Sequence, residues 1–267
     1  MAQRETSVLT RYDRDGFVFV PPLVEAELVE EAIPHMDAVI AAEYETGIAP
    51  HWRKWDPGDD ETRLRKIDQP QLCDRTIQRL VAHPAIGQTA AELTGASMIQ
   101  VWGVQLLYKP PGGGAAGNVG WHQDEQYWLR WWTPDSEIFT CWLALSDVTE
   151  RAGAMRFVPG SHRWGLLGEG DFYEAEIDRQ RDEIHIPHGE EWREVVAELG
   201  PGAASFHHRL TYHGSGPNSS GGARCSFAIH LRTERSEPAD LSPLPADQVA
   251  YMSYLDDRDI CPVIFGG

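Results

Sequence analysis

Cysteine, long apolar runs and positive charge are all scarce in this chain of 267 residues. The four cysteines, Cys73, Cys141, Cys225 and Cys261, form no C-x-x-C pair, which argues against a disulfide framework and against a thiolate zinc site. No apolar run is long enough to span a bilayer, and the start, MAQRETSVLTRYDRDG, is not a basic segment followed by an apolar one. We therefore predict a cytoplasmic protein with reduced cysteines.

The shortage of positive charge restricts the partners. The chain has 23 Lys and Arg against 41 Asp and Glu, which gives a formal net charge of -18. A field of this sign repels nucleic acid and anionic membranes, so we expect neither as a partner. A solvated acidic surface accounts for most of the charge, and a local basic pocket can still exist within it.

The order of the expected elements is helices first and strands later. Apolar residues recur at helical intervals in residues 22–46, where Pro34 is expected to kink or divide the helix, and again in residues 74–94, which end at Gly95. From residue 97 onward, short runs rich in Val, Ile, Phe, Trp and Tyr alternate with Pro, Gly and Ser. These runs are typical of strands in a jelly roll or barrel.

The chain contains no linker, so we expect one domain over residues 1–267. The predicted fold class is mainly β with flanking helices: N-terminal helices at about 22–94 and a jelly-roll core, a cupin-like double-stranded β-helix, at about 97–235. An acid-rich insertion at about 166–199 is too long for a tight hairpin. A lid over a site and a surface ornament both fit this insertion.

The stretch GWHQDEQYW, residues 120–128, places His122 and Asp124 two positions apart. In a β-strand, residues i and i+2 share a face, with Cα atoms roughly 6.5–7 Å apart. That spacing suits two ligands of one metal ion. An amphipathic strand with its polar face in water gives the same pattern, so the pair alone does not decide between the two.

A second stretch, FHHRLTYHGSGPNSSGGAR at 206–224, contains three histidines. His207 and His213 share strand parity while His208 points the other way, so parity cannot choose between the first two. A histidine at a strand end beside small residues has room for a metal, which favours His213. We expect His207, His208 and His230 to be ordinary hydrogen-bonded histidines of the core or surface.

Two imidazoles and one carboxylate form the facial triad that holds non-haem Fe(II), although zinc accepts similar ligands. Arg224, on the strand-like run after His213, favours iron. Its guanidinium suits the distal carboxylate of a small dicarboxylate cosubstrate, with which it can form a bidentate, charge-assisted pair.

At this point the sequence resembles the phytanoyl-CoA dioxygenase family of Fe(II)- and 2-oxoglutarate-dependent oxygenases, over nearly the whole chain. The resemblance is carried by several motifs in the family's order, which together are much more specific than any one of them. They are DGFVFVPPLV at 15–24, LLYKPPG at 106–112, WHQDEQYW at 121–128, WLALSDVTERAGAMRFVPGSHRWG at 142–165, and HGSGPN at 213–218 followed by Arg224.

The resemblance implies roles for single residues. His122, Asp124 and His213 match the iron ligands, and Arg224 matches the anchor of the far carboxylate of 2-oxoglutarate. The resemblance also places other residues near the same cosubstrate, namely Ser215, Trp142, Gln105 and Lys66. The run Gly160-Ser161-His162 matches a family turn that shapes the barrel mouth.

The resemblance also implies the reaction. With Fe(II), 2-oxoglutarate and O2, such an enzyme releases succinate and CO2 and usually hydroxylates its substrate, with cyclisation, epimerisation or desaturation as close variants. Related halogenases lack the carboxylate ligand, and Asp124 provides that ligand here. An oxidation that does not depend on halide is therefore expected. We predict a small-molecule substrate of specialised metabolism, for which an aromatic set following the metal pair can form a wall, although core packing also explains it: Tyr127, Trp128, Trp131 and Trp132.

Two alternatives remain open. An acyl-CoA hydroxylase fits the family, but the acidic balance of the chain counts against a CoA ester. A cupin-type metal-dependent isomerase or hydrolase, or a small-molecule binding module, fits the jelly roll, but such a protein has no need of an arginine at position 224.

Overall fold

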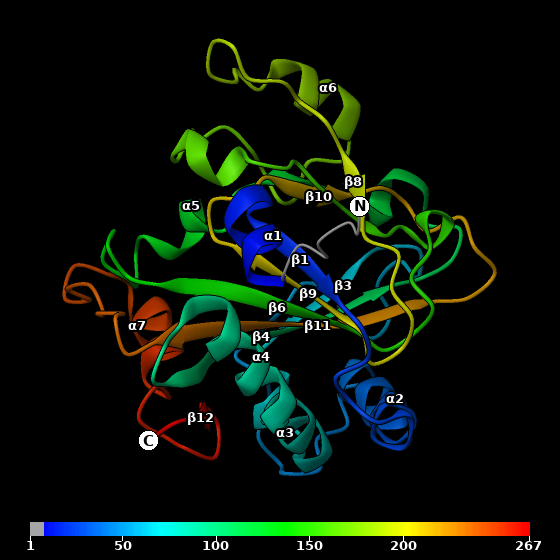
Figure 1. The fold of residues 1–267 in the computed structure, drawn as a ribbon. Helices are drawn as coiled ribbons and strands as arrows, with labels where there is room; N and C mark the ends of the chain where they lie inside the picture. Colours follow the sequence, from blue (N-terminus) through cyan, green and yellow to red (C-terminus); the bar gives the residue numbers. More distant parts are fainter. Residues whose placement is uncertain (1–7) are drawn as a thin grey trace, which may run out of the picture.

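The computed structural model describes residues 8–267 as two antiparallel sheets packed against each other, with helices covering one side (Figure 1). The chain start was predicted to lack a signal segment. Residues 1–7 of this stretch lie outside the described residues. Within the described part, no helix has the length and apolar character needed to cross a membrane.

The larger sheet has the strand order β1-β9-β6-β11-β4-β3-β2, and β12 pairs with β4. Its longest strands, β4 and β11, lie beside each other, and β6 pairs with the other edge of β11. The bounds are β1 Phe17–Val20, β2 Trp52–Arg53, β3 Arg65–Asp68, β4 Ile99–Lys109, β6 Ile138–Ala144, β9 Ala204–His208, β11 Arg224–Thr233 and β12 Val263–Phe265.

The smaller sheet has the order β5-β10-β7-β8. Its strands are β5 Val119–His122, β7 Met155–Phe157, β8 Val195–Val196 and β10 His213–Ser215. Apolar side chains of the two sheets meet in one cluster, in which Phe157 of β7 packs with Trp142 of β6. The predicted double-stranded β-helix is confirmed, but β1, β2, β3 and β12 come from outside the predicted core range.

Helices α2, α3 and α4 cover the outer face of the larger sheet, below the strands in Figure 1. The predicted helix over 74–94 is two helices, because His83 is extended and Pro84, which lacks an N–H, begins a new helix. Pro34 leaves α2 undivided. The helices are α1 Val8–Asp15, α2 Ala26–Ile40, α3 Arg75–Val81, α4 Pro84–Thr94, α5 Glu125–Trp128, α6 Ile177–Glu183 and α7 Ala246–Met252, with 3-10 turns at Pro70–Leu72, Gly114–Gly117, Glu150–Ala152 and Ser161–Trp164.

The two faces of the larger sheet have different tasks, because side chains alternate along each strand. On β11, Phe227 and Ile229 belong to the core under the helices. Ala228 and His230 face the other way and line a cavity between the sheets. The interior of the β-helix is therefore shared between apolar packing and a site.

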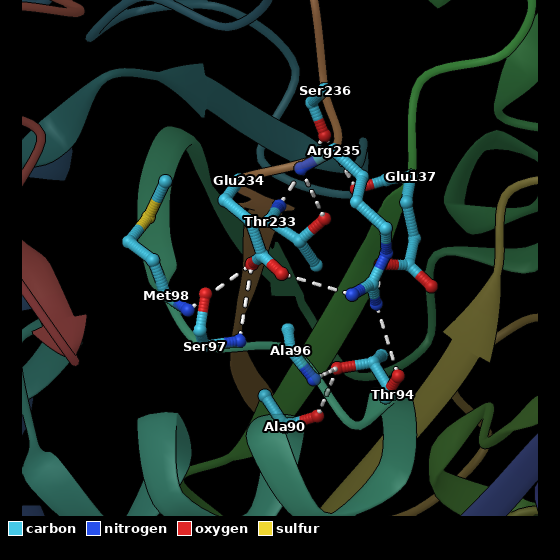
Figure 2. Close-up of polar contacts among 10 residues, drawn as sticks. All are labelled: Ala90, Thr94, Ala96, Ser97, Met98, Glu137, Thr233, Glu234, Arg235 and Ser236. Atoms are coloured by element: carbon cyan, nitrogen blue, oxygen red, sulfur yellow. Dashed lines mark hydrogen bonds and ion pairs between the residues drawn. The ribbon is translucent and has the colours of Figure 1, made fainter.

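A polar cluster ties the end of β11 to the start of β4 and the end of α4 (Figure 2). The Glu234 carboxylate accepts hydrogen bonds from the backbone N–H groups of Ser97 and Met98, at 3.2 and 3.1 Å. Arg235 pairs with Glu234 and Glu137 and donates to the Thr94 carbonyl at the C-terminus of α4. This cluster closes the junction between helix and sheet.

We expect Glu234→Ala to lower the free energy of unfolding by about 1 kcal/mol, because two backbone donors and Arg235 lose a charged partner. Glu234→Gln keeps a neutral acceptor and should lose less. Urea denaturation of the two variants and the parent protein measures the difference. Identical transition midpoints for Glu234→Ala and the parent would show that the cluster does not stabilise the junction.

Candidate active site

A cavity of about 400 Å³ lies between the sheets and is lined from both of them. The smaller sheet contributes His122 and His213, and the larger sheet contributes Arg224 and Trp142. The cavity brings together predicted site residues that lie far apart in the chain, from Lys66 to Arg224. Its lining combines aromatic side chains with a larger number of polar and charged ones.

His122, Asp124 and His213 converge at this cavity, with ligand atoms all within 4.8 Å of one another. His122 and His213 are direct cross-strand partners on β5 and β10. The Nε2 atoms of the two histidines lie 3.7 and 3.8 Å from the same oxygen of Asp124, Oδ1. This arrangement leaves the centre of the three atoms available for one cation.

The two predicted residues come together, but the geometry predicted from the sequence was wrong. Strand β5 ends at His122, and Asp124 has a helical backbone, with φ -55° and ψ -35°, at the start of α5. The two side chains meet because the chain turns there, and strand alternation does not apply.

Both histidines have a fixed tautomer. His122 Nδ1 donates to the Gly120 carbonyl at 2.8 Å, and His213 Nδ1 donates to the Thr211 carbonyl at 3.0 Å. A carbonyl oxygen can only accept, so each Nδ1 carries the hydrogen and each Nε2 presents a lone pair. Burial lowers the pKa of both imidazoles, which keeps them neutral at pH 7 and ready to bind a metal.

The two oxygens of Asp124 are in different environments. Oδ1 faces His122 and His213, whereas Oδ2 accepts a 3.0 Å hydrogen bond from the Thr140 hydroxyl and lies 3.4 Å from His207 Nε2. Burial opposes ionisation of Asp124, but the surrounding histidines outweigh it and lower the pKa of the carboxyl. Oδ1 of the carboxylate is thereby left for a metal.

His207 is closer to the site than the sequence predicted. The run 203–213 is not one strand: β9 ends at His208 and β10 begins at His213, so the parity argument linking His207 and His213 is wrong. His207 lies on the larger sheet, buried, with its Nε2 beside Asp124 Oδ2. We missed it because this proximity depends on how two sheets pack.

Arg224 is a buried cation with unused donors. Its Nη1 donates to the Gly153 carbonyl at 3.2 Å, but Nε and Nη2 have no partner in the described part of the chain. The guanidinium lies 5.2 Å from the centre of the Trp142 ring. Burial lowers the pKa of Arg224 to about 10, so it stays charged at pH 7. A buried charge without an anion is costly, which indicates an anionic ligand.

Lys109 is a second buried basic residue near Arg224, and it was not predicted from the sequence. Its Nζ donates to Ser215 Oγ at 2.7 Å and to the Gly216 carbonyl at 2.5 Å. Because Ser215 Oγ accepts this bond, its own hydrogen stays free to donate to a ligand in the cavity. Strand alternation could have predicted its position, because Lys109 follows Gln105 by four positions on β4 and therefore shares its face.

The remaining cosubstrate candidates also line the cavity. Gln105 extends from β4, and Lys66 of β3 pairs with Asp68 at 2.6 Å. The run Gly160-Ser161-His162 does not line it. Ser161 Oγ instead accepts from the Tyr212 backbone N–H at 2.8 Å, so the turn supports the start of β10.

The four aromatic residues predicted to form a substrate wall do not all line the cavity. Tyr127, Trp128 and Trp131 line the cavity, but Trp132 does not. The Trp132 ring is buried, with its centre 5.4 Å from that of Trp102, in an apolar cluster that also contains Trp128. Residues on the short helix α5 and the turn after it cannot all face one side. A run of aromatic residues there therefore predicts more cavity-lining residues than the structure has.

Other cavity residues come from segments that carried no motif. Phe172 and Tyr173 belong to the predicted insertion, and the Phe172 ring lies 5.1 Å from the His122 ring. The insertion is tied to β5, because Gln180 bonds both backbone groups of Trp121. Further lining residues come from before and after the predicted core: His51, Trp52, Gln248 and Tyr251.

The fold and this residue set define the chain as a double-stranded β-helix protein with a His-Asp-His metal-ligand arrangement facing a buried arginine. It belongs to the phytanoyl-CoA dioxygenase family, whose sequence model matches residues 12–226. The predicted resemblance is confirmed.

The relatives are named for different substrates. A probable alpha-ketoglutarate-dependent hypophosphite dioxygenase of Stutzerimonas stutzeri is 30% identical over 170 residues, which are 61% of this chain and 55% of that protein. An ectoine dioxygenase of Bordetella parapertussis is 25% identical over 243 residues, which are 84% of this chain and 74% of that protein. The chain spans little more than half the length of the first relative and of a Caenorhabditis elegans protein, a probable phytanoyl-CoA dioxygenase, at 55% and 56%.

Solved structures with the same fold include two alpha ketoglutarate dependent enzymes from nogalamycin biosynthesis. The epimerase SnoN, in complex with Fe3+, alpha ketoglutarate and nogalamycin RO, has a TM-score of 0.66 and 26% identity, covering 88% of this chain and 86% of its own. The non-heme monooxygenase ThoJ has a TM-score of 0.64 and 27% identity, covering 87% of this chain and 79% of its own.

We expect His122→Ala and His213→Ala to lose detectable Fe(II) binding while keeping the fold, because each removes one of three ligand atoms. His207→Ala is the matched control: its imidazole faces Oδ2 of Asp124 and is not a ligand, so affinity should fall by about tenfold to a hundredfold and binding should remain detectable. Anaerobic calorimetric titration with Fe(II) measures binding, and far-ultraviolet circular dichroism reports folding. Equal loss in His207→Ala and His213→Ala would refute the choice of His213 as the third ligand.

Proposed function

We propose that the chain is an Fe(II)- and 2-oxoglutarate-dependent dioxygenase that hydroxylates a small molecule of specialised metabolism. The observation that carries this proposal is Arg224, a buried guanidinium whose Nε and Nη2 have no partner among the described residues and which lines the same cavity as the metal-ligand candidates. A metal site alone does not require such a cation. A dicarboxylate that binds the metal at one end requires it at the other.

The side chains fit both groups. His122 Nε2, Asp124 Oδ1 and His213 Nε2 would hold Fe(II), and the free donors of Arg224 with the Ser215 hydroxyl would hold the far carboxylate of 2-oxoglutarate. Trp142 and Gln105 would line the cosubstrate, whereas Lys66 is already paired with Asp68 and has a weaker case. When bound, the metal and cosubstrate supply oxygen activation coupled to decarboxylation, with succinate and CO2 as products.

The protein's part is positional. Two backbone carbonyls fix the histidine tautomers, Thr140 holds Oδ2 of Asp124, and Lys109 directs the Ser215 hydrogen away from itself. The aromatic residues of the lining would place a substrate against the metal.

The substrate class rests on the cavity and on the relatives. Tyr127, Trp128 and Trp131 offer an apolar surface for a ring-containing body. SnoN and ectoine dioxygenase, by their names, act on small molecules, and SnoN is an epimerase, so variants of the hydroxylation outcome belong within this proposal. A cupin-type isomerase or binding module leaves Arg224 unexplained, and an acyl-CoA substrate is disfavoured by the chain's net charge of -18.

We expect Arg224→Ala to weaken 2-oxoglutarate binding roughly tenfold to hundredfold, because a charge-assisted pair in a shielded pocket is lost. Arg224→Lys should recover only part of the affinity, since an ammonium cannot form the planar fork. The measurement is a 2-oxoglutarate titration of the Fe(II)-loaded protein without oxygen, followed by the visible charge-transfer band of the chelate.

Iron affinity serves as the control and should be the same in all three proteins, because Arg224 is not a ligand. Absence of the band in the parent protein would overturn the proposed function itself. Unchanged 2-oxoglutarate affinity in Arg224→Ala would place the cosubstrate anchor elsewhere.

A further inference from the structure

A row of cross-strand neighbours on the larger sheet lines the cavity next to Asp124. His230 of β11 pairs with Thr140 of β6, and Thr140 pairs with His207 of β9. These cross-strand neighbours face the same side of the sheet and line the cavity. The function proposed above uses Thr140 and leaves His230 without a role.

Hydrogen-bond accounting fixes the tautomer of His230. The ionised Asp124 carboxylate can only accept, so the single hydroxyl hydrogen of Thr140 goes to Oδ2, at 3.0 Å. The Thr140 oxygen also lies 3.1 Å from His230 Nδ1. Since Thr140 has no second hydrogen, the imidazole must be the donor, and Nδ1 carries its hydrogen.

The opposite nitrogen of His230 is then a lone-pair acceptor. Burial lowers the pKa of His230 to about 4, so the ring is neutral at pH 7 and Nε2 carries no hydrogen. Nε2 is buried and has no partner among the described residues. The ring is held in place by aromatic neighbours: its centre lies 4.9 Å from that of Trp128 and 5.4 Å from that of Trp102.

The place of His230 distinguishes it from the cosubstrate end of the cavity. Along β11 the inward-facing positions run from Arg224 through Ala228 to His230. Six residues of strand separate Arg224 from His230 by roughly 20 Å, which is further than a five-carbon dicarboxylate reaches. The free acceptor therefore lies beyond the reach of a cosubstrate held by Arg224, beside the Trp128 and Trp131 wall.

We infer that His230 Nε2 accepts a hydrogen bond from a hydroxyl or amine of the substrate, and that the chain Asp124–Thr140–His230 holds the imidazole in the tautomer required for it. The substrate class is then a small molecule with an apolar ring body and a hydrogen-bond donor. This inference rests on the proposed function only for its statement that the cavity receives a substrate.

The tautomer can be tested directly. In protein labelled with [15N]histidine and loaded with Zn(II), long-range 1H–15N correlations should show His230 with a protonated Nδ1 and an unprotonated Nε2. His230→Phe assigns the signal by removing it. Thr140→Val removes the acceptor and should shift the signal toward the other tautomer. A protonated Nε2 in the parent protein overturns the inference.

The recognition can be tested with a matched pair of probes, 2-naphthol and 2-methoxynaphthalene, which differ in the donor hydrogen. The parent protein should bind the alcohol about fivefold to tenfold more tightly than the ether, and His230→Phe should lose this preference. Zn(II) affinity reports whether the variant keeps its site. Equal binding of the two probes, a preference retained in His230→Phe, or no binding of the alcohol overturns the inference.

Neither test uses 2-oxoglutarate or turnover. A failure of cosubstrate binding in the Arg224 experiment would therefore refute the proposed function and leave the His230 results standing. The reverse outcome would refute only the role of His230.

Discussion

The pairing of β11 with β4 on one side and β6 on the other is the constraint on which the site depends. Because the register is fixed, Ala228 lies between Gln105 and Trp142, and His230 lies between Gly103 and Thr140. A shift of β11 by one residue would turn Ala228 and His230 into the helix-covered core. The apolar residues at alternate positions, such as Phe227 and Ile229, hold this register because they belong to that core.

The smaller sheet is held to this frame by short strands and side-chain hydrogen bonds. Strand β10 has three residues, yet it places both His213 and Ser215. Lys109 of β4 bonds Ser215 across the gap between the sheets, and Thr140 of β6 bonds Asp124. The larger sheet therefore orients the groups that the smaller sheet and its turn present.

The parts of the site that the sequence predicted are those encoded locally or by motif order. His122 and Asp124 are close in any conformation, and the interval from His213 to Arg224 spans one turn between neighbouring segments. His207, Lys109 and Tyr251 were missed because their positions depend on contacts between distant elements.

The errors have the same physical origin. Pro84 divides the predicted helix, a break at 209–212 separates β9 from β10, and Trp132 turns away from the cavity. Each depends on where the chain bends, and apolar patterning predicts burial more readily than it predicts bends.

Two of the unsatisfied polar groups among the cavity residues lie towards opposite ends of β11. Arg224 offers unpaired donors at the start of β11, and His230 offers an unpaired acceptor near its end. Buried polar groups without partners are costly, so a fold that keeps one of each sign on the same strand face must recover that cost from ligands. Asp124 bonds Thr140, the neighbour of His230, at one end. His213 shares β10 with Ser215, which is bonded by Lys109, the cross-strand partner of Arg224, at the other end. The candidate metal ligands therefore adjoin both ends, so that an anion held at Arg224 and a hydrogen-bond donor held at His230 would occupy separate parts of one cavity, as a cosubstrate and a substrate that react at one centre require.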